Sequence, residues 1–497
     1  MFECIVSEKN HFFFLGGAKD KTGRHTVHLL CYQHGKLLAT TTVGFGNLEK
    51  EIGKLSSLIP GFDYLNCHTG ALLSDVLYEK LKKGEFPVYD AISALGWQPN
   101  HNRSCSYAGT QLLGPNGNVL FHGLAPDLPK SAGETKAWSH QLAKWAKGHI
   151  QRQAILALSL AAPLASRNGK NILVALTGGS SSGKTTAAQL AISLFMPPNS
   201  DKVSFTFNAT DNALMQSLHE NEGVPVLIDD TSLSGMASFE NMIYTLANGT
   251  SRARLRNKRL EQTKHWHTTI FLTAERSLLD HRARNLEGAL GRLIEMPISG
   301  ADLFDSSTQA QSIAKFCHSC YGVAGIRFVR FLLQATTLDI NERYRDWKEY
   351  LETQNLTQNH LVSRQIEQIA LVSLAAELAN QIGLTLNAEE IATYLLSCVL
   401  DSIECDAAAK DASLLAEQIV EEKIQEIFAS KCNEIYWGQK GPFLSVSSDI
   451  WKEFVRDSEL GAHEISRIRQ QLGYTNATLS IGGKMHRGFY LNKEVNR

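Results

Sequence analysis

The chain lacks several patterns that would fix its class at once. Among its 497 residues, no stretch approaches the roughly 18 consecutive apolar residues of a membrane-spanning helix. The N-terminus has no basic segment before an apolar run, so we expect no signal peptide, no membrane association and a cytoplasmic location. Lys and Arg number 49 against 50 Asp and Glu, which excludes a uniformly basic histone-like protein but leaves room for local basic patches.

A repeating cysteine pattern is also missing. Nine cysteines are spread from Cys4 to Cys432, and an odd number without regular spacing favours free thiols over a disulfide framework. Cys317 and Cys320 form a close CxxC pair, but no second pair lies nearby, and a structural zinc site needs four ligands. We therefore expect two buried structural thiols on a helix rather than a metal or redox site.

Four regions follow one another along the chain, without repeats or low-complexity segments. Residues 1–130 contain short strands and turns, with a hairpin expected over residues 25–43, and are predicted to form an α+β domain. Residues 131–300 alternate buried strands with helices, which is typical of a parallel α/β sheet. Residues 301–430 have helical periodicity, and residues 431–497 mix strands with two short helices.

The strongest signal is a phosphate-binding loop. The apolar strand 172–176 leads into Gly178, and Gly183, Lys184 and Thr185 complete the pattern GxxxxGK[ST] ahead of a helix at 187–195. Such a loop directs backbone N–H groups at phosphates, while the lysine binds the β/γ-phosphates and the hydroxyl binds Mg²⁺. A Gly/Ser-rich linker is the alternative. The predicted ATP-binding residues are Gly178, Gly179, Ser180, Ser181, Ser182, Gly183, Lys184, Thr185 and Thr186.

Two acidic residues follow the next apolar strand. Val224–Ile228 ends at Asp229 and Asp230, a Walker-B arrangement in which Asp229 joins Thr185 at Mg²⁺ and Asp230 polarises the attacking water. Two solvated loop acids would be the alternative. Most AAA+ ATPases have Glu at the second position, so Asp230, which is one methylene shorter, makes nucleotide binding a firmer expectation than efficient hydrolysis.

Further candidate catalytic residues lie beyond this strand. The strand 268–272 ends at Thr273, where a polar residue can sense the γ-phosphate, although a threonine at a strand end is also ordinary structure. Arg292 ends a helix just before the strand 293–296, the place from which an arginine finger reaches a neighbouring subunit. A surface arginine that caps its own helix is the alternative.

The segment 249–264 holds six cations and one acid. Arg252, Arg254, Arg256 and Lys258 recur at every second position, which on one strand would place them on one face. Like charges side by side repel, so a polyanion such as DNA would stabilise them. A solvated edge strand is the alternative. The predicted DNA-binding residues here are Arg252, Arg254, Arg256, Lys258, Arg259 and Lys264.

These segments resemble a known family. GGSSSGKTTA, VPVLIDDTSLSG, YTLANGTSRAR, TTIFLTAE and HSCYGVAGIRF are similar to the domain of unknown function 927, found in bacterial mobile elements and prophages and similar to MCM-like AAA+ helicases. The resemblance covers about residues 90–400. It implies a sensor-2 role for Arg364, with Arg327 as a rival. Asp230 and Thr273 depart from the Glu and Asn usual at their positions.

The C-terminal region has the order of a winged helix. Helices are expected at 447–456 and 462–472, followed by a Gly-Gly turn and a last strand. Such a module binds duplex DNA or, alternatively, another protein. The candidate DNA-binding residues are Arg467, Arg469, Lys484 and Arg487.

Together these features predict an α/β P-loop AAA+ core (131–300) with an N-terminal α+β domain (1–130), a helical lid region (301–430) and a C-terminal winged helix (431–497). The expected function is that of an ATP- and Mg²⁺-dependent ring helicase that moves on single-stranded and forked DNA. The ring is expected to be a homo-oligomer, in the form of a hexamer. The alternative is a nucleotide switch or defence ATPase whose output is ring assembly. A fused primase lacks support, because residues 1–130 hold no recognisable acidic catalytic cluster.

Overall fold

The computed structural model describes most of the chain. The described residues are 3–6, 11–19, 25–33, 36–44, 75, 78–79, 82–83, 88–90, 92, 94–98, 105–120, 128–207, 210–229, 236–251, 255–256, 259–260, 263–279, 287–299, 302–355, 360–430, 435–438, 441–446, 453–456, 458, 460 and 462–490.

The chain divides into two compact units, one within residues 1–279 and 287–400 and the other within residues 401–497. The second unit begins inside helix α13 (Ala388–Ser430), earlier than the boundary at 431 that the sequence indicates. The physical reason is that the C-terminal part of α13 contributes Ala416, Val420 and Ile424 to the apolar core of the second unit. This part of the helix therefore belongs with the strands that follow it.

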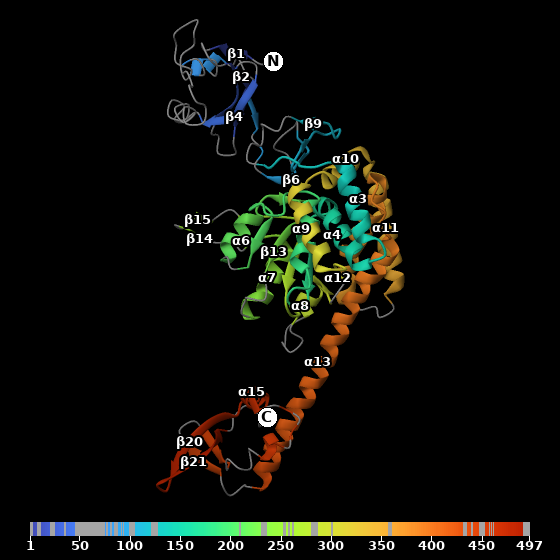
Figure 1. Ribbon diagram of the computed structural model, residues 1–497. Helices are drawn as coiled ribbons and strands as arrows, with labels where there is room; N and C mark the ends of the chain where they lie inside the picture. Colours follow the sequence, from blue (N-terminus) through green and yellow to red (C-terminus); the bar gives the residue numbers. More distant parts are fainter. Residues whose placement is uncertain are drawn as a thin grey trace. The chain divides into compact units, whose positions relative to one another are not determined.

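A five-stranded parallel sheet forms the centre of the first unit (Figure 1). Its order is β11-β13-β16-β10-β17, and β10 and β16 are buried along their whole length, as expected for strands covered on both faces. The bounds are β10 Ile172–Thr177, β11 Ser204–Thr206, β13 Val226–Asp229, β16 Thr269–Ala274 and β17 Leu293–Pro297. The predicted parallel α/β sheet is confirmed.

Helices pack against this sheet and against one another. Helix α4, rich in Ala and Leu, is buried over residues 154–165, because it packs against β10 and β16 and also against α12. Helices α9 to α12 lie in the region 301–430, where helical periodicity is predicted. The bounds of the helices are α3 Thr135–Ala146, α4 Ile150–Arg167, α5 Lys184–Ser193, α6 Asp211–Leu218, α7 Met236–Asn248, α8 Glu287–Leu290, α9 Ser307–Ser319, α10 Ala324–Gln334, α11 Thr337–Gln354, α12 His360–Ala379 and the short 3₁₀ helix η4 Asn380–Ile382.

Two further sheets precede or flank the central one. The first has the order β1-β2-β3-β4, with β5 paired to β2, and it contains the predicted hairpin as β3 and β4. The second has the order β12-β6-β7-β8-β9. The bounds are β1 Glu3–Val6, β2 His11–Lys19, β3 His25–Gln33, β4 Lys36–Gly44, β5 Val88–Asp90, β6 Leu95–Trp97, β7 Tyr107–Ala108, β8 Leu112–Leu113, β9 Val119–Leu120 and β12 Asn221–Glu222.

The second unit contains a four-stranded sheet, the helix α15 and the C-terminal part of α13. The sheet order is β18-β19-β21-β20, and Ile465 and Ile468 of α15 pack into the same core as the end of α13. The bounds are β18 Ile435–Gly438, β19 Gly441–Ser445, α15 Ala462–Gln471, β20 Thr475–Ile481 and β21 Lys484–Tyr490.

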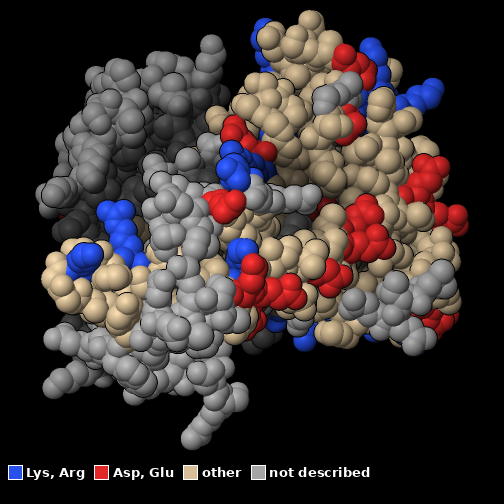
Figure 2. Space-filling model, turned by 90° about the horizontal axis from the view of Figure 1, so that it is seen from below, with Lys and Arg blue, Asp and Glu red and all other residues tan. Residues whose placement is uncertain are grey.

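The surface and the thiols agree with the composition. On the face seen in Figure 2, acidic and basic side chains are interspersed, in keeping with the balanced charge. Within the described residues, no helix is long and apolar enough to cross a membrane.

Cys317 lies near the end of α9 and Cys320 directly after it, and both are buried free thiols as predicted. Burial raises the pKa of Cys317 to about 12, so this thiol stays protonated.

Candidate functional site

The P-loop, residues 178–185, joins the end of β10 to the start of α5. Two of its glycines are required by the backbone and by close neighbours. Gly183 has φ +84°, and a Cβ there would lie 2.6 Å from the ring of Phe304. Gly178 has φ +152°, and its Cβ would lie 2.1 Å from the carbonyl oxygen of Ile298. Only glycine fits both positions without displacing a neighbour, so the motif is set by packing as well as by chemistry.

Lys184 is the first residue of α5 and is held inside the loop. Its ammonium Nζ donates to the carbonyl oxygens of Gly178 (2.9 Å) and Gly179 (2.7 Å) and to Ser182 Oγ (3.0 Å). The residue is only 8% exposed. A cation is therefore fixed in the concave side of a glycine-rich loop at a helix N-terminus, where the helix dipole also favours an anion.

Three elements converge on Asp229 at the end of β13. Its Oδ1 accepts hydrogen bonds from Thr185 Oγ1 of α5 (3.0 Å) and from Thr273 Oγ1 of β16. The register of the parallel strands explains this meeting, because the carboxyl ends of β13, β16 and β10 lie side by side. A carboxylate beside a hydroxyl is the oxygen donor set that Mg²⁺ prefers, so these residues fit such an ion.

The other predicted loop residues lie where a ligand could reach them. Gly179, Ser180 and Ser181 are exposed, whereas Thr186 on the first turn of α5 is half-buried. Ser181 has φ +63°, an uncommon value for a residue with a side chain. The second predicted acid, Asp230, lies outside the described residues.

Glu295 is a buried carboxylate that the sequence analysis did not select. It lies on β17, is 8% exposed, and its Oε1 accepts from Thr177 Oγ1 (3.1 Å), directly before the P-loop. Its Oε2 accepts from Ser277 Oγ (3.1 Å) and from the backbone N–H groups of Leu278 (3.1 Å) and Leu279 (3.3 Å). Glu295 therefore ties the segment after β16 to the end of β10. An acid inside the apolar strand Leu-Ile-Glu-Met was the available signal.

Arg292, the predicted finger, and Arg364, the predicted sensor-2 residue, lie toward the end of the central sheet opposite the P-loop. Arg292 precedes β17, whose first residue Leu293 pairs with Leu173 near the start of β10. Arg364 is exposed on α12, and the next residue, Gln365, donates to the carbonyl oxygens of Leu290 (2.9 Å) and Leu293 (3.1 Å). The fold thus brings the two arginine positions to one region of the unit.

The Arg292 side chain also has partners of its own. Its Nη1 donates to the carbonyl oxygen of Gly288 (2.7 Å), and its guanidinium carbon lies 4.6 Å from the centre of the Tyr244 ring. Within this chain Arg292 therefore caps the end of α8. Its role as a finger in a neighbouring subunit stays a prediction.

Part of the basic segment forms a hairpin. β14 (Leu255–Arg256) pairs antiparallel with β15 (Arg259–Leu260), so Arg256 stands opposite Arg259. The single cationic strand face stays a prediction, because Arg256 alone of its four members is described. At the base of the hairpin, the N–H of Ser251 donates to the carbonyl oxygen of Lys264 (2.9 Å). Arg252, Arg254 and Lys258 lie outside the described residues.

The C-terminal candidates separate into exposed and buried groups. Lys484 and Arg487 are exposed on β21, and Arg467 is half-buried on α15. Arg469 is only 3% exposed, and burial lowers the pKa of its guanidinium. The prediction that Arg469 binds DNA is therefore corrected, because its side chain lies on the same face of α15 as Ile465 and away from solvent.

Comparison with known proteins gives a family match and likenesses to solved structures. Residues 93–265 match the family model described as domain of unknown function (DUF927), which confirms the predicted family over the first part of the predicted range 90–400. The solved structure described as "SCCmec type IV Cch - active helicase" aligns with 99% of this chain and 95% of that chain, with a TM-score of 0.59 and 16% identity. A structure of the "NrS-1 C terminal region" aligns with 96% of each chain, with a TM-score of 0.34 and 10% identity. The chain matches no curated protein.

The first of these structures shows that the chain has a fold similar to that of a helicase. Mixed α/β architecture with a parallel sheet is thus common to both. The predicted likeness to MCM helicases, the AAA+ assignment and the winged helix are not tested by this comparison and stay predictions.

Proposed function

Because residues 93–265 match the DUF927 family model and the fold is similar to that of an active helicase, we propose that this chain is an ATP- and Mg²⁺-dependent DNA helicase that moves on single-stranded DNA. The observation that carries the proposal is the convergence of Lys184, Thr185 and Asp229 at one edge of a parallel sheet. A cation in a glycine-rich loop beside a carboxylate–hydroxyl pair suits a nucleoside triphosphate with its metal.

Each residue at this edge has a chemical part in the proposal. Lys184 would exchange its loop carbonyl acceptors for the β/γ-phosphate oxygens, while Thr185 and Asp229 would hold Mg²⁺, which would neutralise phosphate charge. Thr273 shares Oδ1 of Asp229 and so keeps the carboxylate oriented. Asp230, which follows directly in the sequence, polarises the attacking water.

The strand order supports an AAA+ core that works as a homo-oligomer. β16, which carries Thr273, lies between the P-loop strand β10 and the acidic strand β13, so three strand ends surround one site. Arg292 and Arg364 lie at the other edge and cannot reach the P-loop of their own chain without rearrangement. We therefore assign both to a neighbour's site, which requires an oligomer, with a hexameric ring as the expected form.

DNA binding is assigned first to the basic hairpin. Arg256 and Arg259 are direct cross-strand partners, an arrangement that like charges disfavour and that phosphate contacts would stabilise. Lys484 and Arg487 on the last hairpin would contact forked or duplex DNA if the second unit acts as a winged helix. The family resemblance adds a mobile-element setting, and a cytoplasmic location accords with it.

Strand displacement on a forked DNA substrate tests the proposal. The parent chain should separate the strands only with ATP and Mg²⁺, and Lys184→Ala should abolish both hydrolysis and displacement without unfolding the chain. Lys315→Ala removes an exposed lysine from α9 and serves as the matched control. ATP hydrolysis with ring assembly but no displacement would favour the nucleotide-switch function. Unchanged hydrolysis in Lys184→Ala would remove the P-loop from the mechanism.

The hairpin has a test of its own. Each lost phosphate contact lowers the dependence of log affinity on log salt by about 0.7 for a single strand, so Arg256→Ala with Arg259→Ala should flatten the slope by about 1.4. Unwinding should stop while basal ATP hydrolysis continues, because the nucleotide site is untouched. An unchanged slope together with normal unwinding would leave the hairpin as a solvated edge.

A further inference from the structure

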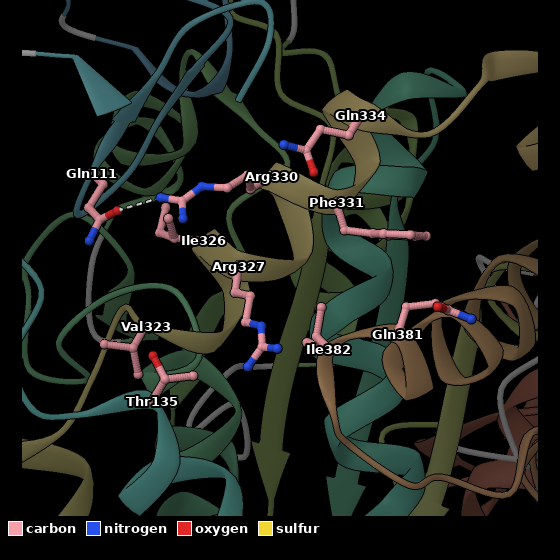
Figure 3. Close-up of a pocket in the computed structure, with 10 residues that line it drawn as sticks. All are labelled: Gln111, Thr135, Val323, Ile326, Arg327, Arg330, Phe331, Gln334, Gln381 and Ile382. Atoms are coloured by element: carbon pink, nitrogen blue, oxygen red, sulfur yellow. Dashed lines mark hydrogen bonds between the residues drawn. The ribbon is translucent and has the colours of Figure 1, made fainter. Parts of the chain in front are cut away.

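A cavity in the first unit lies away from the P-loop. It has a volume of about 340 Å³ and lies between α10, the start of α3, the segment before β8 and the short helix η4 (Figure 3). The backbone N–H groups of Gly322 and Gly325, which lead into α10, donate to the carbonyl oxygens of Ser193 and Leu194 (both 2.8 Å). These acceptors lie at the C-terminal end of α5, about 15 Å along the helix from the P-loop at its other end.

The polar lining of this cavity is cationic. Arg327 and Arg330 lie three residues apart on α10, and no Asp or Glu is among the lining residues. In the described part of the chain, neither arginine has a carboxylate within salt-bridge distance. Adjacent cations on one helix face repel each other, so a bound anion would stabilise the pair.

Arg330 is oriented by its neighbours. Its Nη2 donates to Gln111 Oε1 (3.3 Å), and Gln111 in turn donates from Nε2 to Ser131 Oγ (3.3 Å). The Nε of Arg330 is buried and has no hydrogen-bond acceptor among the described residues. Figure 3 shows the Arg327 guanidinium extending toward the space between Thr135 and Ile382.

The helix α3 adds a weaker attraction for an anion. Thr135, its first residue, lines the cavity, and the N-cap residue Glu134 makes no capping hydrogen bond through its side chain. The first turn of α3 holds no acidic residue. The N-terminus of α3, beside the cavity, therefore adds the positive end of a helix dipole near the two arginines.

We infer that this cavity is a second anion site that binds the phosphate of a nucleotide, either free or within a DNA strand. Arginine forks match phosphate oxygens in bidentate geometry, which lysine cannot do. The volume is within the range of small-ligand sites, and Phe331 and Ile326 offer apolar surface to a base or sugar. Gln334 and Gln381 supply amides that can hydrogen-bond a base edge.

Two probes test the inference on the full chain. The first is AMP, titrated by calorimetry into the Lys184→Ala background so that the P-loop does not contribute. The second is a fluorescent 20-nucleotide oligothymidine, whose affinity is measured over a range of salt. Arg327→Ala and Arg330→Gln should weaken AMP binding about tenfold or lower the salt slope by about 0.7. Arg345→Ala, an exposed arginine of α11 outside the cavity, is the matched control.

The outcomes separate the two sources of the phosphate. Loss of AMP affinity with an unchanged slope identifies a free nucleotide, whereas a flatter slope without AMP binding identifies the strand. The inference is overturned if both cavity variants remain folded by circular dichroism and match Arg345→Ala with both probes. Because these measurements need neither hydrolysis nor unwinding, their failure is distinct from failure of the helicase proposal.

Discussion

Replacing Glu295 by alanine should loosen the P-loop end of the central sheet. The carboxylate accepts from Thr177 on one side and from Ser277, Leu278 and Leu279 on the other, so its removal leaves donors without their acceptor. Thr177 and Leu279 are 4% and 1% exposed, which means that water cannot easily replace the lost oxygen at either place.

The magnitude follows from these two buried donors. A buried polar group left unsatisfied costs about 1–3 kcal/mol, so Glu295→Ala should lower the free energy of unfolding by about 3 kcal/mol. Glu295→Gln keeps the shape and can accept with its carbonyl oxygen from the Ser277 side, while its amide donates to the Thr177 hydroxyl. The glutamine variant should therefore lose about 1 kcal/mol or less.

The pH dependence has a definite sign. Burial raises the pKa of Glu295 above its usual value, so the folded chain holds the proton more tightly than the unfolded chain. Stability from this group is complete below the usual pKa and is lost as pH rises through the raised value. The parent should therefore lose stability relative to Glu295→Gln as the pH increases across that interval.

The assay is urea unfolding at pH 4.5, 5.5 and 7. ATP binding is measured under the same conditions. Both variants should bind ATP less tightly than the parent, and Glu295→Ala more weakly than Glu295→Gln. The reason is that the hydrogen bonds of Glu295 position the end of β10, directly before the P-loop. The reasoning would be refuted if Glu295→Ala matched the parent in unfolding midpoint and slope, or if the parent gained stability relative to Glu295→Gln with rising pH.

Two further predictions concern the loop and the oligomer. Gly183→Ala should destabilise the chain by at least about 1 kcal/mol, because its backbone is left-handed and a methyl would overlap Phe304. Gly179→Ala, where a Cβ meets no atom within 4 Å, is the control in the same denaturant titration, and equal stabilities would contradict the packing argument. Mixing Arg292→Ala with Asp230→Asn subunits should restore part of the ATPase activity if Arg292 acts in a neighbour's site. No recovery in mixed rings verified by mass would argue against that role.

Much of the fold was predictable because its signals are local. The glycines of the P-loop and the apolar strands beside it define a strand–loop–helix unit without knowledge of distant contacts. The meeting of Thr185, Asp229 and Thr273 also follows, because parallel strands present their carboxyl ends at one edge. The partners of Glu295 did not follow, since they depend on the β10–β17 register and on the course of the chain after β16.

The burial of Arg469 shows what a closer reading of the pattern could have corrected. On α15, residues 465, 468, 469 and 472 share one face at helical spacing, so Arg469 belongs with Ile465 and Ile468 rather than with the solvent.

The contacts of Lys184 have a consequence for how fast a nucleotide leaves. Its ammonium finds oxygen partners at 2.7–3.0 Å within its own loop when no phosphate is present. A departing phosphate therefore does not leave a bare buried cation behind, and the transition toward release is not burdened with the full desolvation of that charge. The same loop oxygens compete with each arriving nucleotide for the ammonium of Lys184. The loop should therefore lower both the affinity for the nucleotide and its residence time, which favours rapid turnover over tight binding.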